Sequence, residues 1–110
     1  SSELNLTLHF DQEPQNVVAV RGKPLVLQCA ASSSTPGPVN ISWTQDDEPL
    51  ELVNDSRRYI LRNGSLFFKK VLSKRSGPSH DGFSDQGVYR CLVRNSVGAL
   101  VSRSAQLRIA

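Results

Sequence analysis

Short runs in which hydrophobic and polar residues alternate follow one another along the chain, separated by residues that favour turns. Alternation with a period of two places the hydrophobic side chains of a strand on one face, whereas an amphipathic helix repeats them about every three to four residues. The segments with this strand pattern are residues 6–10, 18–20, 25–30, 40–44, 59–61, 65–71, 88–94 and about 100–109, with 50–53 as a further short edge strand. The pattern therefore predicts an all-β protein.

The same alternation predicts which side chains face the interior. Residues two positions apart in a strand share a face, so each strand offers one hydrophobic row. The rows predicted to face inward are Leu25, Leu27 and Cys29; Ile41 and Trp43; Leu66 and Phe68; Tyr89, Cys91 and Val93; and Ala105, Leu107 and Ile109. These rows are the candidate core.

Proline and glycine mark where strands are expected to bend or end. Pro14 has no N–H group for a central sheet ladder, so it predicts a kink or an edge position in the first strand. Asn63-Gly64 favours a tight turn with positive φ. Residues 72–84 combine scattered charge with two glycine-containing turn pairs, and they are predicted to form a long, mobile connection.

The chain has 110 residues, which suits one domain with a single hydrophobic core. We expect one domain over residues 1–110, with an ordered core from about residue 5 and a flexible lead-in over residues 1–4. No hydrophobic run approaches the roughly 20 residues that span a bilayer, and residues 1–4 lack the features of a secretory signal. If the parent protein is exported, we expect its signal and any membrane anchor to lie outside this sequence.

Two cysteines and four glycosylation sequons indicate an oxidising compartment. The N-x-[S/T] sequons begin at Asn5, Asn40, Asn54 and Asn63. Because glycosylation and disulfide formation share a compartment, the sequons favour a disulfide between Cys29 and Cys91 over two buried free thiols. Such a bridge closes a loop of about 60 residues, which contributes roughly 4 kcal/mol in the chain-entropy model.

Three features occur together in an arrangement that resembles the immunoglobulin superfamily. Trp43 follows Cys29 by fourteen residues, and the run from Asp85 to Cys91 has the form D-x-G-x-Y-x-C. The resemblance implies an immunoglobulin-like β-sandwich, in which two antiparallel sheets are joined by Greek-key connections.

The resemblance also implies roles for single residues. Cys29 and Cys91 bridge the two sheets and Trp43 covers the bridge, while Tyr89 forms the tyrosine corner. Asp85 pairs with a basic residue that opens the strand over residues 59–61. Arg58 is the first choice for this partner and Arg57 is the alternative.

Several segments narrow the resemblance to the I-set, and within it to the N-terminal immunoglobulin domain of the DCC, neogenin, protogenin, Punc and Nope receptor group. They are Glu13-Pro14 leading to Val20-Arg21-Gly22, then Arg62-Asn63-Gly64-Ser65-Leu66, the connection of residues 72–84, and the closing Ser102-Arg103-Ser104-Ala105-Gln106-Leu107. The related Cdon and Boc receptors share much of this pattern.

The resemblance implies an extracellular, non-catalytic recognition or adhesion domain of a type I plasma-membrane receptor in the nervous system or embryo. Netrin or repulsive-guidance ligands are known for some members, so the expected partner is a protein ligand or a homophilic partner, and no nucleic acid. Known ligand contacts in the group lie largely on other domains, so no binding residue is carried over. The alternatives are a structural spacer that binds nothing itself, and an intracellular muscle-type I-set domain, which the sequons disfavour.

Catalytic and metal-binding chemistry are not expected, nor is a cofactor. His9 lies in a predicted strand and His80 in the long connection, so neither suggests a hydrolytic triad. The two thiols are committed if they form a disulfide. Asp46-Asp47-Glu48 lacks the spacing of a Ca²⁺ loop and is interpreted as a solvated turn.

Charge is distributed unevenly, although the net charge of +3 is too small to indicate a nucleic-acid partner. Residues 1–55 have a balance of −6 and residues 56–110 a balance of +9. The cluster of Lys69, Lys70, Lys74 and Arg75 is a candidate site for a polyanion such as heparan sulfate. Ordinary solvated surface charge remains the favoured explanation of this cluster.

A candidate protein-binding surface follows from the strand over residues 88–94. Since Cys91 and its row face inward, Arg90, Leu92 and Arg94 point outward. A leucine framed by arginines suits a protein interface, in which arginine is enriched. Single exposed hydrophobic residues are also common on surfaces without a partner, and a glycan on Asn40 would shield this face.

Overall fold

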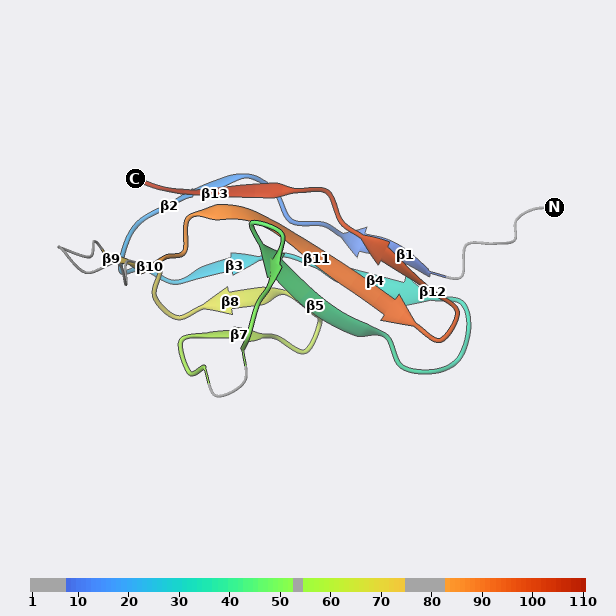
Figure 1. Ribbon diagram of the computed structural model, residues 1–110. Helices are drawn as coiled ribbons and strands as arrows, with labels where there is room; N and C mark the ends of the chain where they lie inside the picture. Colours follow the sequence, from blue (N-terminus) through green and yellow to red (C-terminus); the bar gives the residue numbers. More distant parts are fainter. Residues whose placement is uncertain (1–7, 53–54, 75–82) are drawn as a thin grey trace.

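The computed structural model describes residues 8–52, 55–74 and 83–110. In these residues the regular secondary structure consists of β-strands (Figure 1). The strands are β1 (Leu8–Gln12), β2 (Val17–Ala19), β3 (Leu25–Leu27), β4 (Ala30–Ser33), β5 (Asn40–Gln45), β6 (Glu48–Pro49), β7 (Arg58–Ile60), β8 (Leu66–Phe68), β9 (Ser73–Lys74), β10 (Phe83–Ser84), β11 (Gly87–Asn95), β12 (Gly98–Val101) and β13 (Ala105–Ile109). The prediction of an all-β fold is confirmed.

The larger of two layers runs in the order β2–β13–β11–β5–β6, and β12 also pairs with β11. Most of these neighbours are antiparallel, as predicted, and the parallel pair is β2 with β13 at one edge. The second layer has the order β3–β8–β7. The strand β4 continues the line of β3 and pairs with β1 (Figure 1).

The chain crosses between the layers from β4 to β5, from β6 to β7, and between β8 and β11. These crossings give the Greek-key sandwich that the sequence predicts. Pro14 marks a further crossing, because β1 pairs with β4 in the smaller layer and β2 pairs with β13 in the larger one. Pro14 is fully buried and has no N–H group to offer a ladder.

The hydrophobic core fills the space between the layers. Most members of the predicted inward rows are buried, namely Leu27, Cys29, Trp43, Leu66, Phe68, Tyr89, Cys91, Val93, Ala105 and Leu107. Leu25, Ile41 and Ile109 are only partly buried and pack against the edge of this core.

The edge strand predicted over residues 50–53 is wrong, because the edge strand is β6. Asp46 and Asp47 have φ values of 53° and 69°, so the chain reverses within two residues and Glu48 already pairs with Gln45. Beyond Pro49, one further backbone contact joins this edge to β5, in which the Leu50 amide donates to the Trp43 carbonyl at 3.0 Å. Leu50 and Leu52 then pack against the core as loop residues, and residue 53 lies outside the described part of the chain.

The single strand predicted over residues 100–109 is also wrong, because it is divided into β12 and β13. At the break, the Cys91 amide donates a hydrogen bond of 2.9 Å to the hydroxyl of Ser102. The strand predicted over residues 25–30 divides in the same way, where the Cys29 amide donates to the hydroxyl of Ser65 at 3.1 Å. A serine hydroxyl replaces a backbone carbonyl at both places.

The connection predicted over residues 72–84 begins and ends in a short antiparallel pair, β9 with β10. Phe83 lies opposite Lys74, and Ser84 lies opposite Ser73. The prediction missed these strands, because two residues are too few to establish an alternating pattern. Residues 75–82, on which the rest of that prediction falls, lie outside the described residues, as do residues 1–7 with the predicted lead-in.

Candidate functional site

A disulfide joins the two layers at the centre of the sandwich. The sulfur atoms of Cys29 and Cys91 are bonded, and their Cα atoms lie 6.6 Å apart, so the predicted disulfide is confirmed. Trp43 lies opposite Cys91 in the register of β5 and β11 and is buried. Its indole N–H donates a hydrogen bond of 2.8 Å to the carbonyl of Gly64, which satisfies the polar atom of the ring.

Tyr89 fixes the entry of the chain into β11. Its hydroxyl donates a hydrogen bond of 2.5 Å to the backbone carbonyl of Asp85, which is the geometry of a tyrosine corner. Its ring meets Phe68 edge to face, with centroids 5.9 Å apart. Burial, and to a lesser extent the negative charge of Asp85, raise the pKa of Tyr89 well above its ordinary value.

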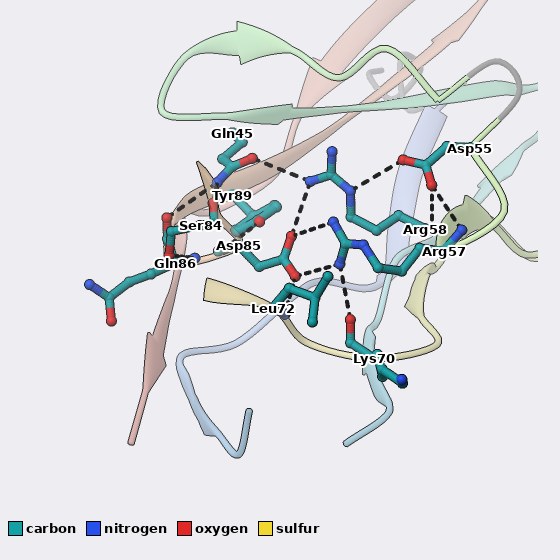
Figure 2. Close-up of polar contacts among 10 residues, drawn as sticks. All are labelled: Gln45, Asp55, Arg57, Arg58, Lys70, Leu72, Ser84, Asp85, Gln86 and Tyr89. Carbon is teal, nitrogen blue, oxygen red and sulfur yellow. Dashed lines mark hydrogen bonds and ion pairs between the residues drawn. The ribbon is translucent and has the colours of Figure 1, made fainter. Parts of the chain in front are cut away.

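The carboxylate of Asp85 is fully buried and binds two arginines (Figure 2). Nη1 and Nη2 of Arg57 lie 2.6 and 3.1 Å from its two oxygens, and Nη1 of Arg58 lies 3.4 Å from one of them. The sequence favoured Arg58 with Arg57 as the alternative. The structure brings both to Asp85, and the closer, bidentate contact belongs to Arg57.

The same carboxylate also binds the chain that leads into β9. The amide of Leu72 donates to Asp85 Oδ2 at 2.7 Å, and the amide of Asp85 donates to the carbonyl of Leu72 at 2.9 Å. The ring of Phe83 lies 5.0 Å from the guanidinium carbon of Arg57 and 5.3 Å from that of Arg58. Asp85 therefore connects β7, the chain before β9 and the start of β11 (Figure 2).

Asp55 holds the start of β7 in place. Its carboxylate accepts hydrogen bonds from the amides of Arg57 and Arg58 at 2.8 and 3.1 Å and lies 3.6 Å from Nε of Arg58. Burial opposes ionisation, but these hydrogen bonds and the two positive charges lower the pKa of Asp55 below its ordinary value. The charges of Asp55, Asp85 and the two arginines therefore have a structural role, since they hold the start of β7 against the chain before β11.

The outer surface of β12, β11 and β5 is the candidate recognition site, and we name it the β11 face. Tyr89, Cys91 and Val93 are buried, so Arg90, Leu92 and Arg94 point away from the core. Leu92 lies opposite Ser42 on one side and Val101 on the other. The β11 face comprises Ser42, Arg90, Leu92, Arg94 and Val101.

Hydrophobic surface at the centre of this face is larger than the sequence indicated. Val101 is 60% exposed, and Leu92 beside it is partly buried. The alternation of β12 places Val101 outward, but the sequence interpretation treated β12 and β13 as one strand and did not assign that valine. Arg90 pairs with the exposed Asp47 at 2.8 Å, whereas Arg94 is exposed opposite Asn40 and Ala99.

Two of the four predicted glycosylation sites lie in described residues. Asn40 is exposed at the start of β5, beside the β11 face. Asn63 is exposed in the turn before β8, and its side-chain oxygen accepts a hydrogen bond of 2.9 Å from the Ser65 amide. Asn5 and Asn54 lie outside the described residues.

The predicted polyanion cluster is described only in part. Lys69 and Lys70 are exposed directly after β8, while the side chain of Lys74 and all of Arg75 lie outside the description. A cavity of about 300 Å³ is lined by Ser56, Arg57, Lys69, Lys70 and Leu72. The sequence does not place Arg57 in this cluster, because no local pattern relates Arg57 to the lysines. The two meet through backbone pairing between Arg57 and Lys69, which lie twelve residues apart.

Residues considered for metal binding or catalysis are dispersed. His9 lies on β1, 3.3 Å from Asp11, with both side chains about half exposed, and His80 is outside the described residues. In the three described segments, no three His, Cys, Asp or Glu side chains come together as metal ligands would. Those segments also hold no helix long and hydrophobic enough to cross a bilayer.

Several known proteins are similar to this chain. Rat neogenin is 41% identical over 105 residues, which cover 94% of this chain and 7% of neogenin. Mouse protogenin is 34% identical over 93% of this chain and 8% of its own length, and the rat netrin receptor DCC is 35% identical over 94% and 7%. The chain thus spans less than a tenth of these relatives, and the predicted resemblance to their group is confirmed.

Solved structures and a family model agree with this assignment. The N-terminal Ig1-2 module of the Drosophila receptor tyrosine phosphatase DLAR superposes with a TM-score of 0.73 at 24% identity, over 94% of this chain and 45% of that one. The first domain of Duf (Kirre) gives 0.70 at 26% identity, over 94% and 96%. The family model for the immunoglobulin domain matches residues 9–95. The chain therefore belongs to the immunoglobulin domain family.

Proposed function

We propose that this domain is an extracellular, non-catalytic recognition module of a plasma-membrane receptor of the DCC and neogenin type, and that it forms a single domain of the I-set. The similarity to neogenin, protogenin and DCC supports the proposal. DCC is named as a netrin receptor, which favours a protein partner for this chain too. A second copy of the chain on a facing cell is the other expected partner.

The main observation behind the proposal is that Leu92 and Val101 lie side by side on the outer surface of the sheet. Arg90 and Arg94 flank this pair on the same strand. A hydrophobic centre within a rim of arginines has the composition of protein interfaces, where a few central residues supply most of the binding energy. Asn40 lies directly opposite Arg94 on the same face, so carbohydrate on Asn40 would cover that end of the face and would count against the proposal.

A binding experiment on beads tests the β11 face. We expect beads coated with the chain, produced in a secretory host, to bind purified netrin or beads carrying the same chain. Val101→Lys should weaken that binding at least tenfold, because a further positive charge between Arg90 and Arg94 must be desolvated without a partner. Val18→Lys is the matched control, since Val18 is 61% exposed on β2 at the edge of the same sheet. Equal binding by the two variants would remove the β11 face from the proposal.

The spacer alternative predicts a different result in the whole receptor. If the domain is a spacer, its deletion should leave ligand binding unchanged. If it is a recognition module, its deletion should abolish ligand binding. The intracellular alternative predicts no loss of mass when the protein isolated from its natural cells is treated with a peptide glycosidase. We expect a mass loss, because Asn40 and Asn63 are both exposed in the folded chain.

A further inference from the structure

We propose that the cavity beside β7 and β8 binds a sulfate group of an acidic polysaccharide, and that the neighbouring aromatic side chains hold a sugar ring of the same molecule. The cavity measures about 300 Å³ and is lined by Ser56, Arg57, Lys69, Lys70 and Leu72. This site lies in the β3–β8–β7 layer. It is therefore separate from the β11 face and does not depend on that face binding a protein.

The charges around the cavity do not cancel. Arg57 is paired with Asp85, and Arg58 lies between Asp85 and Asp55, so these four charges sum to zero. Lys69 and Lys70 are exposed, and no described carboxylate pairs with either. Two uncompensated positive charges therefore remain at the cavity. A polyanion that binds them releases the cations condensed on its own charged groups and gains the free energy of counterion release.

The guanidinium group of Arg57 is held in position before any ligand arrives. Asp85 binds it through two nitrogens, and Nη1 also donates to the carbonyl of Lys70 at 2.9 Å. Its side chain remains 20% exposed. Three of the five N–H groups of Arg57 are used in these bonds, so two remain for an anion and the two lysines supply the other donors. Because the guanidinium is already fixed, its remaining donors cost little conformational entropy on binding.

An aromatic ridge continues from the cavity along the same two strands. Tyr59 pairs with Phe67 in the register of β7 and β8, and their ring centroids lie 5.3 Å apart at an interplanar angle of 56°. Two register positions further along, beyond the Arg58–Phe68 pair, the Lys69 amide donates to the Arg57 carbonyl at 2.8 Å. Residues two positions apart share a face of a sheet, so the aromatic pair lies directly beside the cationic pair.

This combination favours a sulfated sugar chain over other anions. Tyr59 is 39% exposed, and the negative face of its ring suits the weakly positive C–H groups of a sugar ring. A free anion would make no use of the ridge. A phosphatidylserine surface would offer phosphates to the lysines but no sugar ring to Tyr59, so it too would make no use of the ridge.

Titration of the 110-residue chain with a heparin hexasaccharide at several salt concentrations tests the cationic half of the site. For Lys69→Gln with Lys70→Gln we expect at least a tenfold loss of affinity, and a slope of log Kd against log salt that falls by about two, one for each lost contact. Arg62→Gln with Arg108→Gln removes two exposed charges elsewhere and should change neither value by more than about twofold. Equal losses in both double variants would overturn the proposal.

The aromatic half has its own test. Tyr59→Ala should weaken hexasaccharide binding several-fold without changing the salt slope, while Tyr59→Phe, which keeps the ring, should bind as the original chain does. Melting temperatures of the variants control for unfolding. The proposal is overturned if Tyr59→Ala binds normally, if unsulfated hyaluronan binds as well as heparin, or if the chain binds phosphatidylserine vesicles but not heparin.

Discussion

At the scale of single residues, two serine hydroxyls stabilise the backbone of the bridged cysteines. Ser65 accepts a hydrogen bond from the Cys29 amide and Ser102 accepts one from the Cys91 amide, and both serines are buried. A buried N–H group without a partner costs about 1–3 kcal/mol. These serines therefore stabilise the two places where the strands are interrupted beside the bridge.

We expect Ser65→Ala and Ser102→Ala each to lower the free energy of unfolding by about 1–3 kcal/mol, because each leaves a buried amide unpaired. Urea denaturation of the oxidised chain measures this change. Ser104→Ala is the control, since Ser104 is exposed two residues further along. If Ser102→Ala costs no more than Ser104→Ala, the hydroxyl does not have the role described.

The buried phenol of Tyr89 makes stability depend on pH in the alkaline range. Folding raises its pKa above the ordinary value of 10.0, so above pH 10 the unfolded chain releases a proton that the folded chain retains. The stability contribution is complete below that pH and is lost as pH rises towards the folded pKa, with a limiting slope of about 1.4 kcal/mol per pH unit. We expect the slope measured by denaturation to steepen above pH 9 and to approach this limit near pH 11, and Tyr89→Phe should reduce it.

At the scale of the elements, Asp85 joins segments that the sheets do not connect. It binds both arginines at the start of β7 and the amide of Leu72 before β9, and it lies two residues before β11. Removing one partner of a buried ion pair leaves charge without compensation, which costs about 3–5 kcal/mol. We expect Asp85→Asn to lower the free energy of unfolding by about 3 kcal/mol.

An exposed pair provides the comparison for that substitution. Asp47 binds Arg90 at 2.8 Å, but its side chain is 83% exposed, so water and salt screen the attraction. Asp47→Asn should therefore cost less than about 1 kcal/mol. Equal effects of Asp47→Asn and Asp85→Asn on the denaturation midpoint would contradict the role assigned to Asp85.

The elements also show what the sequence could predict and why. Strand alternation identified most of the core, because burial of one face is a local pattern that a period of two reveals. The break between β12 and β13 depends on the Ser102 hydroxyl bonding to Cys91, a contact across eleven residues with no local signal. The candidate sites show the same difference between local and long-range signals. The outward positions of Arg90, Leu92 and Arg94 could be predicted from alternation within one strand. The cavity could not, because Arg57 and Lys69 meet only through pairing between two strands.

At the scale of the whole molecule, one covalent bond links two layers that are otherwise held together by packing and by the polar contacts of Trp43 and Asp85. Cys29 and Cys91 are separated by 62 positions, and closing a loop of that size restricts the unfolded chain by about 4 kcal/mol. Domains of this size are stable by about 5–15 kcal/mol. The bridge therefore accounts for a large share of the stability with which the sandwich presents its two outer surfaces.

We expect reduction of the disulfide to lower the urea midpoint by about 2 M, since 4 kcal/mol is lost at a denaturant slope of about 2 kcal/mol per M. Fluorescence of Trp43 reports the transition, because it is the single tryptophan of the chain and is buried opposite Cys91. Cys29→Ala with Cys91→Ala is the control, and reductant should not shift its midpoint. If the oxidised and reduced chains unfold at the same urea concentration, the bridge does not have the stabilising role assigned here.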